Sequence, residues 1–199
     1  MRTRKRPPFV GVALAALLAS PSAGYIHFPP PTLRQMCQQS TNIRVLTVKK
    51  HDKERGVIVF EATETLKGEN RKGMSFRHVI GKAARGTGPI RAWVGDGKKA
   101  VMFTIENGAI ACGYVFLDNF CYSVDYNKAG DFWLLIRVDP EMAACFHGTA
   151  ETLRRVTKSL LGGQDVPVPV DESVKPLSLE ERQKRAPALN EILKKNRGQ

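Results

Sequence analysis

The sequence contains no apolar stretch long enough to cross a membrane as a helix. The hydrocarbon core of a bilayer is about 30 Å thick and requires about 20 consecutive apolar residues. The apolar run at Phe9–Ala19 has 11 residues, and the rest of the chain has no comparable run. We therefore expect no stable membrane insertion once an N-terminal targeting segment has been removed.

Closely spaced metal-binding and catalytic motifs are also missing. Structural zinc sites usually show close pairs of cysteine or histidine, but the histidines are scattered, at His27, His51, His78 and His147. The sequence has no C-x-x-C pair, no G-x-S-x-G nucleophile elbow and no phosphate-binding loop. We therefore predict no metal site, no cofactor and no enzymatic activity.

One pair of residues leaves an alternative open. Cys145 and His147 lie two positions apart, and a cysteine nucleophile needs a base within hydrogen-bond reach. The alternative function is a hydrolase or a metal-binding protein that uses these two side chains.

The chain has an excess of basic residues but no pattern typical of nucleic-acid binding. Lysine and arginine total 31 against 19 acidic residues, which gives a formal net charge of +12. These residues are spread over turns, without the focused basic stripe and stacking aromatics that a nucleic-acid site requires. The charge favours attraction to anionic surface polymers and argues against a nucleic-acid partner.

The first 24 residues have the order of a secretory signal. Four basic residues within positions 2–6 precede the apolar run, and Ser22-Ala23-Gly24 supplies small residues before Tyr25. Cleavage before Tyr25 would leave 175 residues and lower the formal net charge to +8. We therefore expect an exported protein, periplasmic or extracellular. An uncleaved N-terminal anchor is the alternative.

Seven short segments have the composition and alternation of β-strands, with turn residues between them. They span residues 42–50, 57–66, 74–80, 100–105, 109–117, 120–126 and 132–138. Between the third and fourth of these, residues 81–88 form a glycine-rich stretch that predicts a loop. The even spacing favours a mainly β fold, a single small antiparallel barrel or sandwich, rather than alternating strands and helices.

Helices are predicted mainly after the strands. Short helical turns are expected at residues 32–40 and 89–94, and Thr149 is a suitable N-cap for a helix over 150–161. Residues 25–163 then form the globular domain, and the proline-rich residues 164–177 form an extended linker. Residues 178–199 complete the chain as a helical tail, beginning with a capping-box pattern.

The four cysteines are expected to include one disulfide, because disulfides persist in an oxidising compartment. In a hairpin about Asp118-Asn119, Phe116 lies opposite Cys121 and Asp125 lies opposite Cys112. The two cysteines are then roughly 13 Å apart at about 3.3 Å per residue, too far to be joined. We predict a bond between Cys37 and Cys145, with four free thiols as the alternative.

Aromatic residues crowd three neighbouring strands. They are Phe116, Phe120, Tyr122, Tyr126, Phe132 and Trp133. One interpretation places them in the core and in cross-strand pairs. The other interpretation is an exposed face that binds a partner, with Tyr114, Phe116, Tyr126 and Trp133 as the candidate binding residues.

The chain resembles a family of exported planctomycete proteins in several segments: YIHFPPPTLRQMC, NIRVLTVKK, GVIVFEATETLKG, WVGDGKKAVMF, FWLLIR and CFHGTAETL. The resemblance covers nearly the whole mature chain and implies no known activity.

Residues 37–161 also resemble netrin-like domains, in a cysteine before the first strand, a strand ending at Lys67-Gly68 and a final helix after a cysteine. That family implies a barrel of the oligonucleotide/oligosaccharide-binding (OB) type and includes the tissue inhibitors of metalloproteinases. In those inhibitors the first mature residue is a cysteine whose free amine binds the protease zinc. Here Cys37 lies 12 residues inside the predicted mature chain, so the resemblance does not imply that mechanism.

These observations predict an exported, non-enzymatic binding domain whose partner is a protein or an anionic polymer of the cell envelope. A structural component of the envelope is a further alternative.

Overall fold

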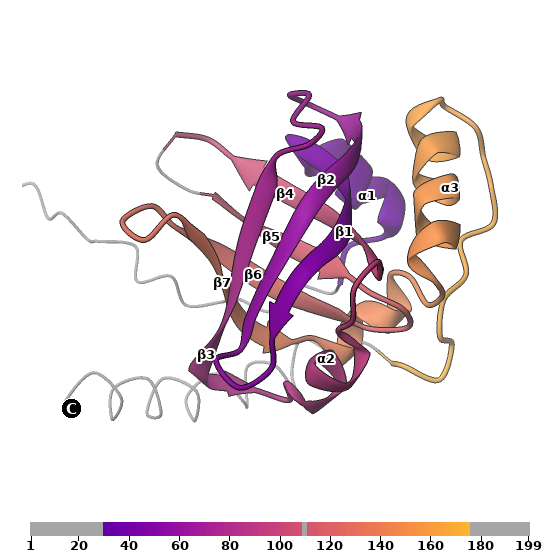
Figure 1. Ribbon diagram of the computed structural model, residues 1–199. Helices are drawn as coiled ribbons and strands as arrows, with labels where there is room; N and C mark the ends of the chain where they lie inside the picture. Colours follow the sequence, from indigo (N-terminus) through magenta and orange to yellow (C-terminus); the bar gives the residue numbers. More distant parts are fainter. Residues whose placement is uncertain (1–29, 109–110, 176–199) are drawn as a thin grey trace, which may run out of the picture.

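The chain folds into a closed β-barrel that carries helices on one side and at one end (Figure 1). The computed structural model describes residues 30–108 and 111–175. Its elements are α1 (Leu33–Gln39), β1 (Asn42–Asp52), β2 (Val57–Lys67), β3 (Ser75–Arg85), α2 (Gly88–Trp93), β4 (Lys99–Glu106), β5 (Ala111–Phe116), β6 (Cys121–Asn127), β7 (Phe132–Val138), the 3-10 helix η1 (Pro140–Ala144) and α3 (Ala150–Leu161).

The strands follow the order β1-β2-β3-β7-β6-β5-β4, and β4 pairs with β1 to close the barrel. Asn42 of β1 lies opposite Thr104 of β4 in this antiparallel pair. The β3–β7 pair is parallel and sets His78 beside Trp133, so the expectation of a purely antiparallel sheet is wrong at this one pair. The predicted mainly β fold is confirmed. Of the two architectures left open, the structure is a barrel, which removes exposed sheet edges.

The predicted hairpin register is confirmed. Cys112 pairs with Asp125 and Phe116 pairs with Cys121. The turn between β5 and β6 places Asn119 at φ 62°, a left-handed conformation that asparagine tolerates better than most residues. Because Cys112 and Cys121 lie at opposite ends of the hairpin, they are not bonded to one another.

The glycine-rich loop predicted at residues 81–88 is wrong in its first half, because β3 continues to Arg85. Gly81 lies inside the strand, where a Cβ would come within 3.3 Å of Leu134 Cδ1 on β7. A glycine in a strand often marks such a close approach to a neighbour. Gly81 therefore allows β3 and β7 to approach closely in their parallel pair, and it does not end the strand.

Two hydrophobic cores lie on opposite sides of the barrel wall. Along β1, Leu46 and Val48 face the interior, where Ile90 and Val94 from the α2 segment also pack. Ile43 belongs to a second cluster outside the barrel, beneath α1, η1 and α3. The barrel is therefore filled by side chains, and one patch of its outer wall is also buried.

The two larger surface helices begin with the expected caps. Thr32 and Gln35 form a reciprocal capping box at the start of α1, and the Thr149 side chain accepts a hydrogen bond from the Thr152 amide at the start of α3. The buried face of α3 includes Leu153, which packs in the outer cluster. This arrangement fixes α3 beside the barrel wall.

Residues 164–175 lack regular secondary structure but pack on the domain instead of forming a detached linker. Val166 and Val168 contact the outer cluster. The His147 amide donates to the carbonyl of Pro169 at 2.8 Å, and the Asp171 amide donates to Ala143 at 2.9 Å. The folded unit thus extends beyond the predicted boundary at 163. The predicted signal (1–24) and tail (178–199) lie outside the described residues.

Across residues 30–108 and 111–175, no helix has the length and apolar character required to cross a membrane.

Candidate functional site

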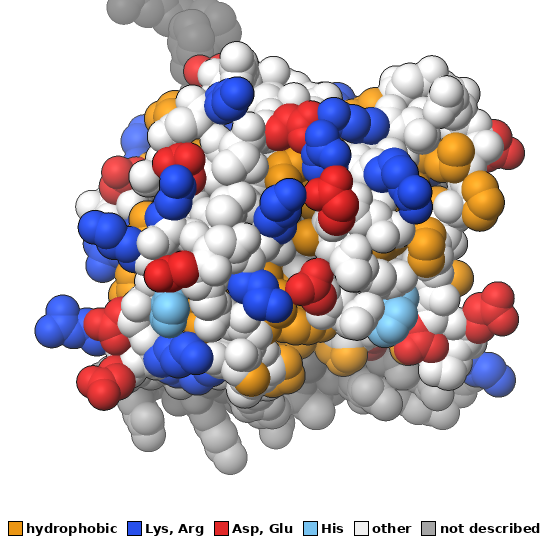
Figure 2. Space-filling model, turned by 45° about the vertical axis from the view of Figure 1, so that its right-hand side comes forward, with side chains coloured by type: hydrophobic (Ala, Val, Ile, Leu, Met, Phe, Trp, Pro, Cys, Tyr) orange, Lys and Arg blue, Asp and Glu red, His pale blue; other side chains and the backbone are white. Residues whose placement is uncertain are grey.

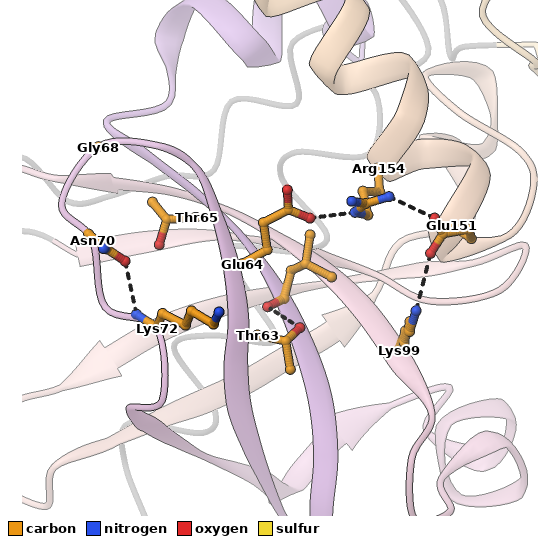
Figure 3. A pocket seen from close by; sticks show the side chains of 10 residues that line it. Thr63, Glu64, Thr65, Gly68, Asn70, Lys72, Lys99, Glu151 and Arg154 are labelled. Carbon is orange, nitrogen blue, oxygen red and sulfur yellow. Dashed lines mark hydrogen bonds and ion pairs between the residues drawn. The ribbon is translucent and has the colours of Figure 1, made fainter.

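A cleft lies on the outer wall of the barrel, between α3 and the strands β1 and β2 (Figure 3). Its volume is about 750 Å³. The β2–β3 turn contributes to one side and the first residues of β4 and α3 to the other. The lining residues are Val45, Thr63, Glu64, Thr65, Gly68, Asn70, Lys72, Lys99, Glu151 and Arg154.

Charged side chains join the two walls of the cleft. The Glu64 carboxylate on β2 accepts a hydrogen bond from Arg154 Nε and pairs with Lys158 Nζ at 2.5 Å. Arg154 also donates to Glu151 at 2.8 Å, and Glu151 pairs with Lys99 at 3.3 Å. The network connects α3 to β2 and β4 across the cleft.

Both carboxylates of this network are ionised at neutral pH. Burial alone would raise the pKa of Glu64, but the hydrogen bonds and charges of Arg154 and Lys158 outweigh it and lower the pKa. The hydrogen bond from Lys99, followed by that from Arg154, lowers the pKa of Glu151. A carboxylate held in this way is neither a proton donor nor a free base, so the cleft is better suited to binding charge than to proton transfer.

Positive charge is in excess in and beside the cleft, where four basic side chains face two carboxylates. Lys72, on the β2–β3 turn, extends its side chain across the cleft (Figure 3). Within residues 30–108 and 111–175, it has no carboxylate partner. Its amide donates to Asn70 Oδ1 at 3.2 Å, which helps to fix the turn. Lys72 is therefore a cation available to a ligand.

The surface around the cleft is mixed in charge. Figure 2 shows this side of the molecule, where basic and acidic side chains lie next to one another with groups of hydrophobic side chains between them. A mixed surface limits non-specific attraction.

The predicted Cys145 and His147 pair does not form a nucleophile and base. Cys145 Sγ donates to Met36 Sδ at 3.3 Å, and burial raises the pKa of the thiol to about 12. His147 Nδ1 is buried without a hydrogen-bond partner among the described residues. A thiol that stays protonated is a poor nucleophile, so this geometry gives the hydrolase alternative no support.

The predicted disulfide between Cys37 and Cys145 is absent, because all four cysteines are free thiols. Both residues do lie in the outer cluster, as their positions before and after the strands suggested. Met36 occupies the position next to Cys145 Sγ. The two cysteines thus contribute apolar packing, which is the usual role of a buried free cysteine.

The four aromatic residues predicted as a binding face do not share one surface. Phe116 is 1% exposed and packs in the outer cluster with Tyr114 beside it. Trp133 faces the barrel interior and is 5% exposed. Tyr126 lies at the rim, its ring 5.2 Å from that of Trp133. The core and cross-strand interpretation describes these residues better than the exposed face.

Sequence reasoning missed the cleft and its network. The i, i+3 spacing of Glu151 and Arg154 was visible, because acidic and basic residues three apart share a helix face. The position of Glu64 was not, because a bulge in the β1–β2 pairing shifts the register beside Val45 and turns the carboxylate toward α3.

The described part of the chain holds no group of three histidine, cysteine or acidic side chains arranged to bind a metal ion. Comparison with known proteins adds no relative: no family model matches the chain, and neither the curated proteins nor the solved structures include a similar one.

Proposed function

We propose that this protein is an exported, non-enzymatic binding domain, and that the cleft between α3 and β2 binds an anionic chain. The carrying observation is Lys72, which has no carboxylate partner in the described part of the chain and lies beside a network with more cations than carboxylates. The ligand class is an acidic segment of a protein or an anionic polymer of the cell envelope.

The ion-pair network of the cleft supports binding rather than catalysis. Its carboxylates are committed to Arg154, Lys158 and Lys99, and none of the lining side chains is a cysteine, serine or histidine. A ligand bearing carboxylates or phosphates would meet Lys72 directly and compete with Glu151 for Lys99. Both contacts are strongest at low salt.

The finer fold assignment that we propose is an OB-like barrel, as the netrin-like resemblance implies. Strands β1, β2 and β3 form a meander, and β4 returns through α2 to lie beside β1. The spatial order 4-1-2-3 is that of a Greek key, and OB-folds are Greek-key barrels. The strand count differs, since OB-folds have five strands.

A binding measurement with one charge change tests the cleft. We expect Lys72→Gln to weaken binding of poly-glutamate roughly fivefold at low salt, because an exposed ion pair contributes up to about 1 kcal/mol. Lys53→Gln, in the β1–β2 turn, is the matched control and should have little effect. Equal losses in the two variants would show that general charge, not the cleft, attracts the ligand.

A further inference from the structure

A buried arginine lies inside the barrel, near the end opposite α2. Arg44 belongs to the first residues of β1 and is 1% exposed. Its guanidinium lies 5.4 Å from the ring centroid of Phe76, at the start of β3. The β2–β3 and β6–β7 turns border this end of the barrel, whereas α2 covers the other end (Figure 1).

The guanidinium uses one of its edges within the protein and not the other. Nη1 donates to Glu106 Oε1 at 3.0 Å, and Glu106 also accepts from Thr104 Oγ1 at 2.7 Å. Nε and Nη2 are buried and have no hydrogen-bond partner among the described residues. These two N–H groups point in the same direction and form a fork that can donate to two oxygens at once.

An arginine fork without an acceptor is unfavourable inside a protein, since buried donors are nearly always paired. Replacing a whole buried ion pair with apolar residues often leaves a fold equally stable, so stability alone does not explain why a guanidinium stands at this position. The planar fork matches the two oxygens of a carboxylate in bidentate geometry. A single water molecule offers one oxygen and matches it less well.

The surroundings of Arg44 favour a ligand with an apolar body. Phe76 covers one face of the guanidinium, and Trp133 lines the interior nearby in the same cluster as Phe76. Tyr126 stands at the rim, where its hydroxyl donates to Asp131 at 2.6 Å.

We propose that this end of the barrel binds the carboxylate of a small organic acid, held by Arg44 Nε and Nη2, with the apolar part of the acid against Phe76 and Trp133. The site is separate from the cleft. Val45, the next residue, lines the cleft from the outer side of the same strand, whereas Arg44 faces inward.

Glu106 limits the affinity of this site. Its carboxylate is ionised, because the hydrogen bonds from Thr104 and Arg44 outweigh the effect of burial and lower its pKa. Arg71 lies within electrostatic range of Glu106 but is itself paired with Glu69 at 2.7 Å. A bound carboxylate would therefore be repelled by Glu106, and Glu106→Gln should bind it more tightly.

The test is a titration of the full chain with benzoate and acetate, followed by NMR of the arginine Nε–H signals. Arg44→Lys identifies the Arg44 signal by its loss. We expect that signal to shift with benzoate at millimolar concentration, and less with acetate, which lacks the ring. Binding measured by calorimetry should weaken roughly tenfold or more in Arg44→Lys, because the fork is lost although the charge is kept.

Glu106→Gln and Lys72→Gln complete the test. The first should tighten benzoate binding and the second should leave it unchanged. A titration in which neither acid shifts the Arg44 signal would overturn the proposal, and so would a response to inorganic phosphate alone. Unchanged affinity in Arg44→Lys would place benzoate elsewhere. None of these results depends on whether the cleft binds an anionic chain.

Discussion

The hydroxyl of Tyr122 lies 3.2 Å from Nδ1 of His78 in the interior of the barrel, where both side chains are fully buried. The two residues come from β6 and β3, which do not pair with each other but both flank β7. The His78 ring also makes an edge contact with Phe60 at 4.9 Å. A titratable side chain is thus enclosed by aromatic rings, with one polar contact.

This enclosure predicts a loss of stability in mild acid. Burial lowers the pKa of His78 to about 3, whereas an unfolded histidine titrates near 6.5. Between these values the unfolded chain binds a proton that the folded chain does not. The free energy of unfolding should therefore fall as pH is lowered from about 6.5 toward 3, by up to about 1.4 kcal/mol per pH unit.

The double variant His78→Phe, Tyr122→Phe is the control for this effect, because it removes both partners of the polar contact. We expect the free energy of unfolding in urea to fall between pH 7 and pH 5 by about 2 kcal/mol more in the natural chain than in the double variant. Parallel pH profiles would mean that His78 is not the group responsible.

Gly113 should not tolerate a larger residue. A Cβ at this position would lie 2.0 Å from the carbonyl oxygen of Phe103 on the paired strand β4. We expect Gly113→Ala to lower the free energy of unfolding by about 3 kcal/mol, through forced separation of the strands. Gly88→Ala is the control, because no heavy atom lies within 4 Å of its Cβ position. Equal stability of the two variants in urea would refute the close approach.

The four thiols should differ in reactivity. Cys112 is half-buried, whereas Cys37, Cys121 and Cys145 are buried. Burial raises the pKa of all four thiols, so solvent access separates Cys112 from the others. In the folded protein we expect iodoacetamide to modify Cys112 first, and all four after unfolding. Cys112→Ser should abolish the fast phase. Peptides crosslinked between any two cysteines would contradict the structure.

Residues 164–175 should contribute measurably to stability. They contain Val166 and Val168, which contact the outer cluster, and Asp165, which pairs with Arg34 at 2.6 Å. Compared with a chain ending at Lys175, one ending at Gly163 should melt about 8 °C lower, which corresponds to roughly 3 kcal/mol for a domain of this size. Identical melting curves would restore the view of this segment as a detached linker.

Local features of this fold were readable from the sequence. The β5–β6 register followed from alternation on both sides of Asp118-Asn119, because residues that pair in a short hairpin lie close together in the chain. The cap at Thr149 likewise depends on neighbours within one helical turn. Each of these features is decided by a few adjacent residues.

Features that depend on distant residues were not readable. The parallel pairing of His78 with Trp133 joins positions 55 apart, and nothing near either residue specifies the partner. Alternation also failed to separate exposed from buried aromatics. Phe116 faces outward from the barrel, yet the outer cluster covers it. The position of Glu64 in the cleft depends on a bulge, which the sequence pattern does not reveal.

The inward Arg44 and the outward Val45 give β1 a means of rejecting a wrong alignment. A slip by one residue would exchange the two faces of the strand. The slip would turn Val45 into the barrel interior and leave the Glu106 carboxylate without its partner guanidinium. A misaligned chain would also move Ile43 out of the outer cluster. Arg44 and Val45 together therefore favour one alignment of β1 in the closed barrel. A strand shifted by one residue would lose contacts both inside the barrel and in the outer cluster.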